Sequence, residues 1–227
     1  FMGSTFGFRL QNMSDLMMDN TVGAGSNNIV LVPADNYTNI GVPILLNAVA
    51  TATIQNLDLS GGTSDAITIN GASTDIQILN NNLSGHRRAV VAASTTNLTI
   101  TSNDFSNTGF NSLPTLELNG VSGLLSLNNN FMGSTFGFRL QNMSDLMIGN
   151  TVGAGSNIIV LIPADNYTDI GAPIQLSSVA TATIQNLNLS GGTSDAIGII
   201  GASTNIDVLN NNLSGHRRAV VATSTTN

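Results

Sequence analysis

The chain has 227 residues, only 8% of them charged, and a formal net charge of −7. Its six basic residues are all arginine, so we expect neither nucleic acid nor an anionic membrane surface as a partner, because both require a basic face. The lack of cysteine excludes disulfides, thiolate catalysis and cysteine-based metal centres, and no apolar run reaches the ~18 residues of a membrane-spanning segment.

A long tandem repeat dominates the sequence. The stretch FMGSTFGFRLQNMSDLM begins at Phe1 and returns at Phe131, and NNLSGHRRAVVA begins at Asn81 and returns at Asn211, so one constant period relates two copies. Residues 131–227 match residues 1–97 at all but 16 of the 97 positions, and residues 98–130 occur once. Repeats of this kind predict a solenoid, in which each short unit is stabilised by stacking on the next.

The repeat also predicts the domain organisation. Residues 1–130 form a first full unit and residues 131–227 a partial second unit of one continuous solenoid, residues 1–227. Because the sequence starts and stops in mid-repeat, we expect it to be a segment of a longer tandem array. Such a segment made alone is expected to associate end to end, because both ends would present open sheet edges.

Within each unit, short segments of alternating apolar and polar residues predict half-buried strands. Each segment is followed by Asn, Gly or Ser, which favour turns and tolerate left-handed backbone. Two kinds of segment alternate along the chain. The first kind comprises residues 44–47, 67–70, 90–92, 116–119 and 138–141. The second kind comprises residues 52–59, 76–83, 98–105 and 125–131.

The spacing of these segments predicts the size of a coil, meaning one full turn of the solenoid. Equivalent positions of the first kind recur every ~22–27 residues, within the range of solenoid repeats. The apolar segments at Ile29–Pro33 and Ile40–Pro43 fit one further coil of about 21 residues and one of about 15. Six coils of about 22 residues then complete each unit. The predicted fold class is all-β, a three-faced parallel β-solenoid.

Stacked coils predict continuous columns of like residues, because neighbouring coils lie about 4.8 Å apart. The 31 asparagines, many of them directly after a strand, predict side-chain ladders at the corners. One apolar column is expected to contain Ile54, Ile78, Ile100 and Leu127. A second is expected to contain Leu59, Leu83, Phe105, Phe131 and Val152.

The recurring motif is apolar-x-apolar-x-x-Asn-x-apolar followed by Ser-Gly or a similar turn, as in residues 76–85. It resembles right-handed parallel β-helix repeat proteins, an architecture shared by pectin-degrading enzymes, phage tailspikes and many bacterial surface proteins. The resemblance covers essentially the whole chain and implies a right-handed fold. The long and nearly exact repeat is most similar to large secreted adhesins and surface-fibre proteins.

The carboxylates give no clear catalytic pattern. Pectin-degrading proteins of this architecture use clustered Asp residues, whereas Asp occurs singly here. Asp58 becomes Asn188 in the second copy, and an amide neither transfers protons nor binds metals well. Asp15, Asp35 and Asp65 stay acidic in both copies, and their places beside turns predict capping of backbone donors or solvation. We therefore predict no catalytic residue, no metal site and no cofactor.

The segment Ser-Gly-His-Arg-Arg, at residues 84–88 and again at 214–218, gathers both histidines and four of the six arginines. One interpretation is a loop between two strands whose arginines pair with local Asp residues. The other is a contact to an anionic glycan or to a neighbouring subunit. The candidate contact residues are His86, Arg87, Arg88, His216, Arg217 and Arg218.

These observations predict an extracellular or cell-surface protein with a structural or adhesive role and no catalysis. It would be a rod segment of a fibre, sheath or giant surface adhesin. The expected partners are further copies of the chain, end to end or side by side, and cell-surface glycans. The alternative is a polysaccharide-active enzyme or a tailspike-like protein that binds or hydrolyses glycans. Paired carboxylates in a cleft would favour this alternative, and a smooth polar surface would favour the rod.

Overall fold

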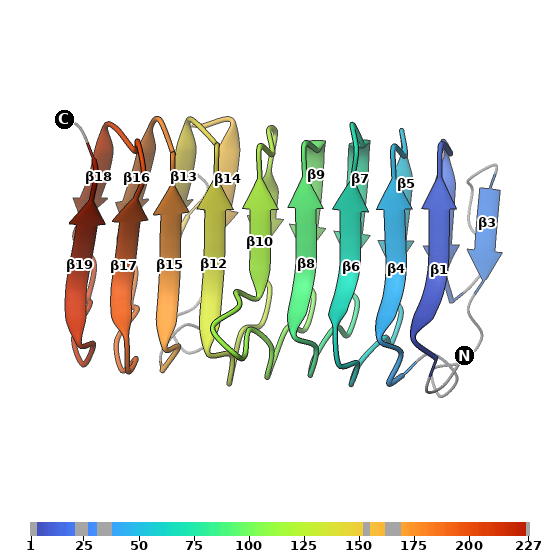
Figure 1. The fold of residues 1–227 in the computed structure, drawn as a ribbon, viewed down its shortest axis with the longest axis horizontal. Coiled ribbons are helices and arrows are strands. Elements are labelled where there is room, and N and C mark those ends of the chain that lie inside the picture. The colour runs from blue at the N-terminus through green and yellow to red at the C-terminus, as the bar shows by residue number, and fades with distance from the viewer. Residues whose placement is uncertain (1–3, 21–26, 31–37, 152–154, 162–168, 226–227) are drawn as a thin grey trace.

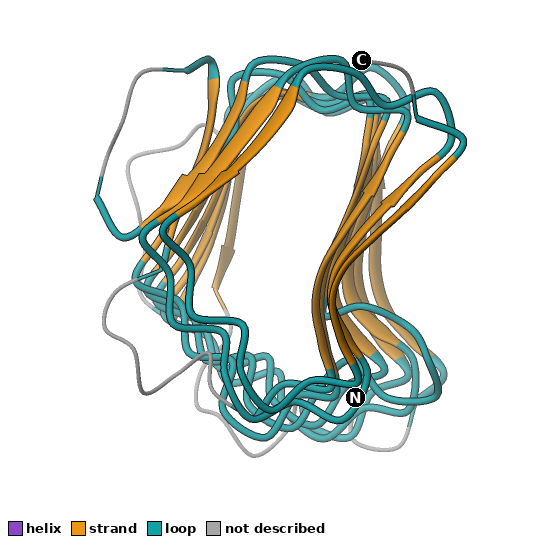
Figure 2. Ribbon diagram, turned by 90° about the vertical axis from the view of Figure 1, so that its left-hand side faces the viewer, coloured by secondary structure: helices purple, strands orange, loops and turns teal. Residues whose placement is uncertain are grey.

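The computed structural model describes residues 4–20, 27–30, 38–151, 155–161 and 169–225. These residues form an all-β solenoid whose strands are parallel and lie in two sheets (Figure 1). The two sheets face each other across the core, and loops close the remaining sides (Figure 2). No helix within the described ranges is long and apolar enough to cross a membrane.

We name the two sheets A and B. Sheet A contains β1 (Phe6–Gln11), β4 (Val42–Asn47), β6 (Asp65–Asn70), β8 (Arg88–Ala93), β10 (Leu116–Asn119), β12 (Phe136–Gln141), β15 (Ala172–Ser177), β17 (Asp195–Ile200) and β19 (Arg218–Thr223), in that order. Sheet B contains β3 (Asn27–Val30), β2 (Leu16–Asp19), β5 (Ala52–Gln55), β7 (Thr74–Leu79), β9 (Thr96–Thr101), β11 (Leu125–Leu127), β14 (Asn157–Val160), β13 (Leu146–Gly149), β16 (Ala182–Gln185) and β18 (Ile206–Leu209).

The register of sheet A gives the size of each coil. Ile44 pairs with Ile67, and Ile67 pairs with Val90. Val90 then pairs with Leu116, and Leu116 pairs with Phe138. These four steps are each about 22–26 residues long, so each is one solenoid turn, in agreement with the spacing in the sequence.

The prediction of six coils per unit is wrong, because β12 pairs directly with β15. Phe138 pairs with Ile174, so sheet A gains no strand between them, and one long coil replaces the ordinary coil and the short coil expected at this point. Each unit therefore adds five strands to sheet A. It adds six strands to sheet B, because β14 lies between β11 and β13. At about 4.8 Å per strand, sheet B grows by ~29 Å per unit and sheet A by ~24 Å.

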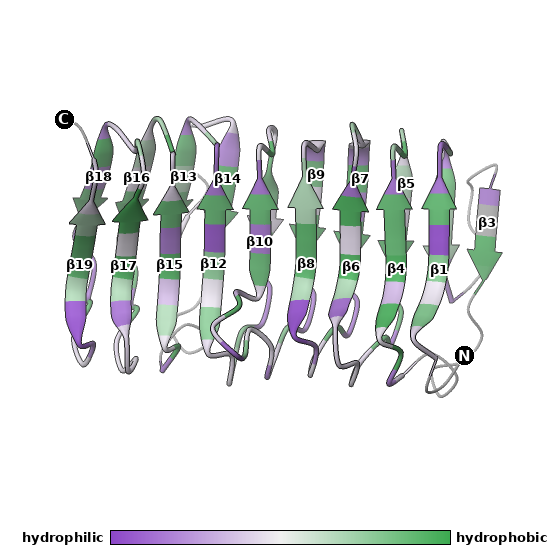
Figure 3. Cartoon of the chain, in the orientation of Figure 1, coloured by the Kyte–Doolittle hydropathy of each residue, from purple (hydrophilic) through white to green (hydrophobic). Residues whose placement is uncertain are grey.

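The core is built from the inward-facing residues of both sheets. Ile54, Ile78 and Ile100 pair in successive strands of sheet B and are fully buried, as the sequence predicts. Hydrophobic residues recur on successive strands (Figure 3). The fourth member of the column is wrong, because Ile100 pairs with Ser126 and places Leu127 on the outer face. Each coil buries too little apolar surface to fold alone, so stability comes from the stack.

The second predicted column is confirmed for the residues that the structure describes. Leu59, Leu83, Phe105 and Phe131 are all buried on the side that connects sheet B to sheet A. The rings of Phe105 and Phe131 meet edge to face with centroids 5.2 Å apart, a favourable geometry for aromatic pairs. Val152 lies outside the described residues.

The corners account for much of the asparagine. Among the described residues, 22 non-glycine positions have positive φ, and most of these are Asn or Asp. These residue types adopt left-handed backbone at low cost because their short polar side chains bond locally. One such column follows sheet B at the residues Asn56, Asn80, Ser102, Asn128, Asn186 and Asn210.

A buried asparagine ladder confirms the predicted corner ladders. The Nδ2 of Asn81 donates to Asn103 Oδ1 at 3.1 Å, and Asn103 Nδ2 donates to Asn129 Oδ1 at 3.1 Å. The same amides also donate to main-chain carbonyls, including Ile78 O from Asn103 at 2.9 Å. The ladder thus satisfies polar groups that the turn leaves inside the protein.

Candidate functional site

The two histidine-arginine segments are located where each coil enters sheet A. His86 is fully buried, with Nε2 2.6 Å from Leu59 O and Nδ1 3.2 Å from Ser64 O. Its ring packs on Gly62, where a Cβ atom would lie 2.1 Å from the ring. Burial lowers the pKa of His86 below its usual value, although the two carbonyl contacts oppose this shift. The histidine therefore links adjacent coils, and the contact with a glycan or subunit predicted for it is not available.

The arginines of this segment lie on the outer face of sheet A. Arg88 binds Asp65 through two bonds, Nε to Oδ1 at 2.8 Å and Nη2 to Oδ2 at 2.6 Å. Arg87 Nη2 lies 3.1 Å from the same Oδ1. Burial alone would raise the pKa of Asp65, but the hydrogen bonds and charges of Arg88 and Arg87 outweigh it and hold the pKa below its ordinary value. Pairing with a local Asp is thus confirmed.

The ion pairs continue across the sheet as a network. Arg88 Nη1 lies 2.5 Å from Glu117 Oε2, and Glu117 Oε1 lies 3.7 Å from Arg139 Nη1. Arg139 Nε donates to Gln175 Oε1 at 2.7 Å. The network therefore runs from β6 to β15. Asp65 serves as an acceptor for arginine, so the capping role expected for it is wrong.

The second copy reproduces the pairing at the last described coil. Arg217 and Arg218 both bind Asp195, with Arg218 Nη2 2.7 Å from Oδ2. The hydrogen bond from Arg218, opposed by desolvation and helped by Arg217, lowers the pKa of Asp195 to about 2. No described strand covers β19, so the two arginine side chains are 62% and 55% exposed.

Replacing Arg88 by glutamine is expected to destabilise the protein by about 2 kcal/mol, since Asp65 and Glu117 both lose a charged donor. The Arg88 and Asp65 side chains are only 17% and 11% exposed. Because the pKa of Asp65 is lowered on folding, its pairing stabilises the protein above the ordinary pKa of 3.8 and is lost as pH falls through the folded value.

Urea unfolding at neutral and acidic pH checks this prediction. The Arg88→Gln protein should lose less stability on acidification than the unchanged protein. Arg218→Gln is the matched control, because it removes the equivalent side chain from an exposed coil and should have a smaller effect. Equal effects of both substitutions would contradict the importance of the network.

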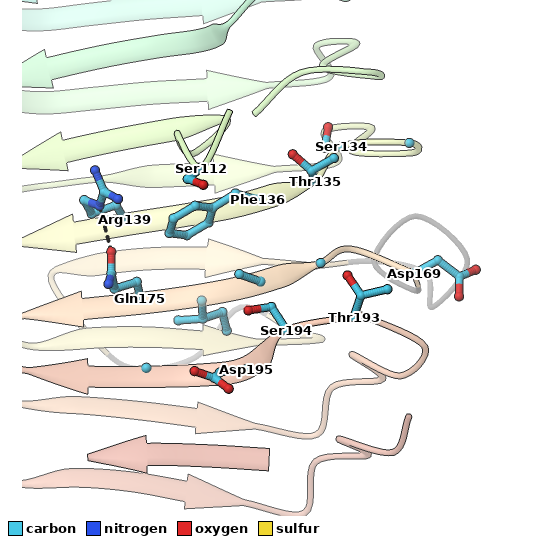
Figure 4. A pocket seen from close by; sticks show the side chains of 15 residues that line it. Ser112, Ser134, Thr135, Phe136, Arg139, Asp169, Gln175, Thr193, Ser194 and Asp195 are labelled. Carbon is cyan, nitrogen blue, oxygen red and sulfur yellow. Dashed lines mark hydrogen bonds between the residues drawn. The ribbon is translucent and has the colours of Figure 1, made fainter. Parts of the chain in front are cut away.

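A groove opens on the same face, between β12, β15 and β17 (Figure 4). Its volume is about 710 Å³. The lining combines hydroxyl groups, an amide, a guanidinium, carboxylates and a small apolar floor. The lining includes Arg139, Asp169, Ala172, Gln175, Asp195 and Gly198.

The two copies differ at this groove. Val42 is replaced by Ala172, Leu45 by Gln175 and Thr68 by Gly198, so the second copy has smaller or more polar side chains. The backbone does not require a glycine at position 198, because a Cβ atom there would meet nothing closer than 3.8 Å. The side chains at these three groove positions are therefore smaller or more polar in the second copy than in the first.

Charge is divided between the two sides of the solenoid. All six arginines lie on or directly before strands of sheet A, whereas these strands carry three carboxylates and the groove beside them adds Asp169. The three carboxylates on the strands are Asp65, Glu117 and Asp195. The protein is acidic overall, yet the outer face of sheet A carries an excess of positive charge.

The remaining acidic residues have different surroundings. Asp145 accepts bonds from the backbone N and the Oγ of Ser156, each at 2.8 Å, and this confirms the capping predicted for that position. Asp35 lies outside the described residues. Across the described ranges, no cluster of three or more His, Cys, Asp or Glu side chains could hold a metal ion.

The contributions of Glu117, Arg139 and Gln175 were not predicted from the sequence. The signal for the first two was available, because Leu116-Glu-Leu-Asn and Phe138-Arg-Leu-Gln align as equivalent strands and place opposite charges side by side. Gln175 could not be found in this way, since a further coil was expected between the strand of Arg139 and the strand of Gln175.

Comparison with known protein families gives one match. The family model described as a right-handed beta helix region matches residues 65–227. Neither a curated protein nor a solved structure matches the chain. The match covers more than half of the residues and agrees with the parallel two-sheet solenoid, so this chain belongs to the right-handed β-helix family.

Proposed function

We propose that this protein is an extracellular or cell-surface rod with a structural or adhesive role and no catalytic activity. The observation that supports this role is the way the two copies join. The strand β10 of the first unit pairs with β12 of the second from Leu116 to Asn119 in unbroken register. Because the joint is an ordinary coil contact, further units would extend the same rod without a linker.

The core at this joint is also continuous. Phe131, the first residue of the second unit, contacts Phe105 of the first unit and lies with its ring 5.0 Å from that of Phe138. Inward positions that differ between copies exchange one hydrophobic residue for another, Met18 for Ile148 and Ile78 for Val208. Most other differences among the described residues lie at exposed or half-buried positions, an exception being the buried Asp19, which becomes Gly149, and the stacking columns are kept.

A direct enzyme assay tests the absence of catalysis. Incubation of the protein with pectin, alginate and other uronic-acid polymers is expected to release neither reducing ends nor unsaturated products. The reason is that Asp65 and Asp195 on the sheet A face are paired with arginine and are therefore poor proton donors. Cleavage that disappears on replacing Asp195 or Asp169 by asparagine would overturn the proposal.

A second candidate function is non-catalytic glycan binding in the groove. The groove of the second copy favours it, because hydroxyl, amide and charged groups over a small apolar floor match the mixed surface of a saccharide. The triple variant Ala172→Val, Gln175→Leu, Gly198→Thr restores the first copy's residues and should fold normally. If the groove binds glycan, this variant loses binding on a glycan array; equal binding by both proteins would rule the groove out.

A further inference from the structure

The side of the solenoid opposite sheet A has the contrary charge. Four exposed carboxylates lie on sheet B or at the turns that enter it, and no basic residue lies there. These carboxylates are Asp15, Asp75, Asp145 and Asp207. Since the two sheets lie on opposite sides of the core (Figure 2), the rod is positive on one face and negative on the other.

Both copies keep a carboxylate on the acidic face, although its position in the sequence differs between the copies. Strand β7 has Asp75 and Gln77, whereas the equivalent residues beside and within β18 are Asn205 and Asp207. All four side chains are exposed. The strand thus keeps one carboxylate on the outer face of sheet B, at a position shifted by two residues and therefore on the same side of the strand.

We propose that copies of this chain associate side by side, with the outer face of sheet A of one copy against the outer face of sheet B of the next. This inference rests on the proposed structural role and specifies how rods would pack. The contact joins two different surfaces, so a bound pair still offers one free sheet A face and one free sheet B face. Such a contact does not close and generates layers or bundles of rods.

The charge distribution predicts how salt affects this contact. A net charge of −7 alone would make copies repel each other. Faces of opposite charge attract each other at short range. This attraction is strong at about 0.01 M salt, where the Debye length is ~30 Å, and weak at about 0.15 M salt, where the Debye length is ~8 Å. Lateral association should therefore weaken as salt rises, whereas end-to-end contacts between apolar coil surfaces should not.

The chain itself supplies the variants for the test. The double variant Asp75→Asn, Asp207→Gln removes two carboxylates from the sheet B face and uses the residues found at the equivalent positions of the other copy. The control Asp58→Asn, Asp104→Asn makes the same change in net charge outside both sheets, in a column where the neighbouring coils already have Asn82 and Asn130. Both variants are expected to fold like the unchanged protein.

Sedimentation velocity at the two salt concentrations measures the association. The unchanged chain should form larger species at low salt. The double variant on sheet B should lose this salt-sensitive association. The control should keep or strengthen the association, because repulsion between the negatively charged chains falls. Stronger association of both variants would show that only net charge matters and would overturn the proposal. A chain that stays monodisperse at low salt would also overturn the proposal, even if the chain then binds an added polyanion. Neither outcome decides whether a single rod is structural, which the enzyme assay and imaging test separately.

Discussion

Substitution of Ile78 by aspartate is expected to abolish cooperative folding of the chain or to lower its stability by at least about 4 kcal/mol. Ile78 is fully buried between Ile54 and Ile100. The substitution removes a stacked apolar side chain and leaves a carboxylate with no partner inside the protein. Because coils stabilise only their neighbours, the damage should spread to the adjacent coils.

Gln77→Asp is the matched control for this prediction. Gln77 directly precedes Ile78 in the same strand and is exposed. The equivalent residue in the second copy is Asp207. Thermal unfolding followed by circular dichroism should give a transition close to that of the unchanged protein for Gln77→Asp and a lost or greatly lowered transition for Ile78→Asp. Similar transitions for the two variants would show that the inward face is assigned to the wrong residues.

Replacing Asn103 by leucine is expected to cost about 2–4 kcal/mol, because buried polar groups on both sides lose their partners. Asn103 Nδ2 donates to Ile78 O, and its Oδ1 accepts from the backbone N of Asn81 at 2.9 Å. Leucine has a similar size and replaces neither bond. The change therefore tests the hydrogen bonds of the ladder with little change in volume.

Ser102→Asn provides the comparison within the same turn. Ser102 has a φ of 58° and occupies the column in which neighbouring coils have Asn80 and Asn128. Asparagine should fit there without loss of stability. Urea unfolding should separate the two variants clearly, and a stable Asn103→Leu protein would mean that the ladder contributes little to the fold.

The errors of the sequence analysis have specific physical causes. Leu127 was placed in the core because strands were aligned from their first apolar residue. In the structure, the register is fixed further along by Asn129 in the ladder and Phe131 in the apolar column, which bring Ser126 beside Ile100. Leu127 faces outward, where it pairs with Val160 of β14.

The long coil could not be recognised from periodicity alone. The residues of β3 and β14 have the apolar character of any other strand, but these strands add to sheet B only. Alternation predicts that a segment is a strand and gives no information about which sheet it joins. The sheet that a strand joins is decided by pairing with strands far away along the chain. Here the deciding contacts are those of β14 with β11 and β13.

The candidate site was predicted in part. The arginine pairs stand out because a chain with few charges repeats them without change, and pairing with a local Asp was expected, although Asp65 was not identified as that partner. The burial of His86 was not predictable from its neighbours in sequence. It depends on the space left by Gly62 one coil away and on the carbonyl oxygen of Leu59.

Imaging of the native assembly by electron cryomicroscopy tests the central claim most directly, because the claim is that the coils build an extended rod outside the cell. The account predicts filaments, bundles or a surface layer in which strands lie perpendicular to the rod axis and repeat about every 4.8 Å along it. Dispersed single particles with no extended assembly on the cell or in its surroundings would contradict it.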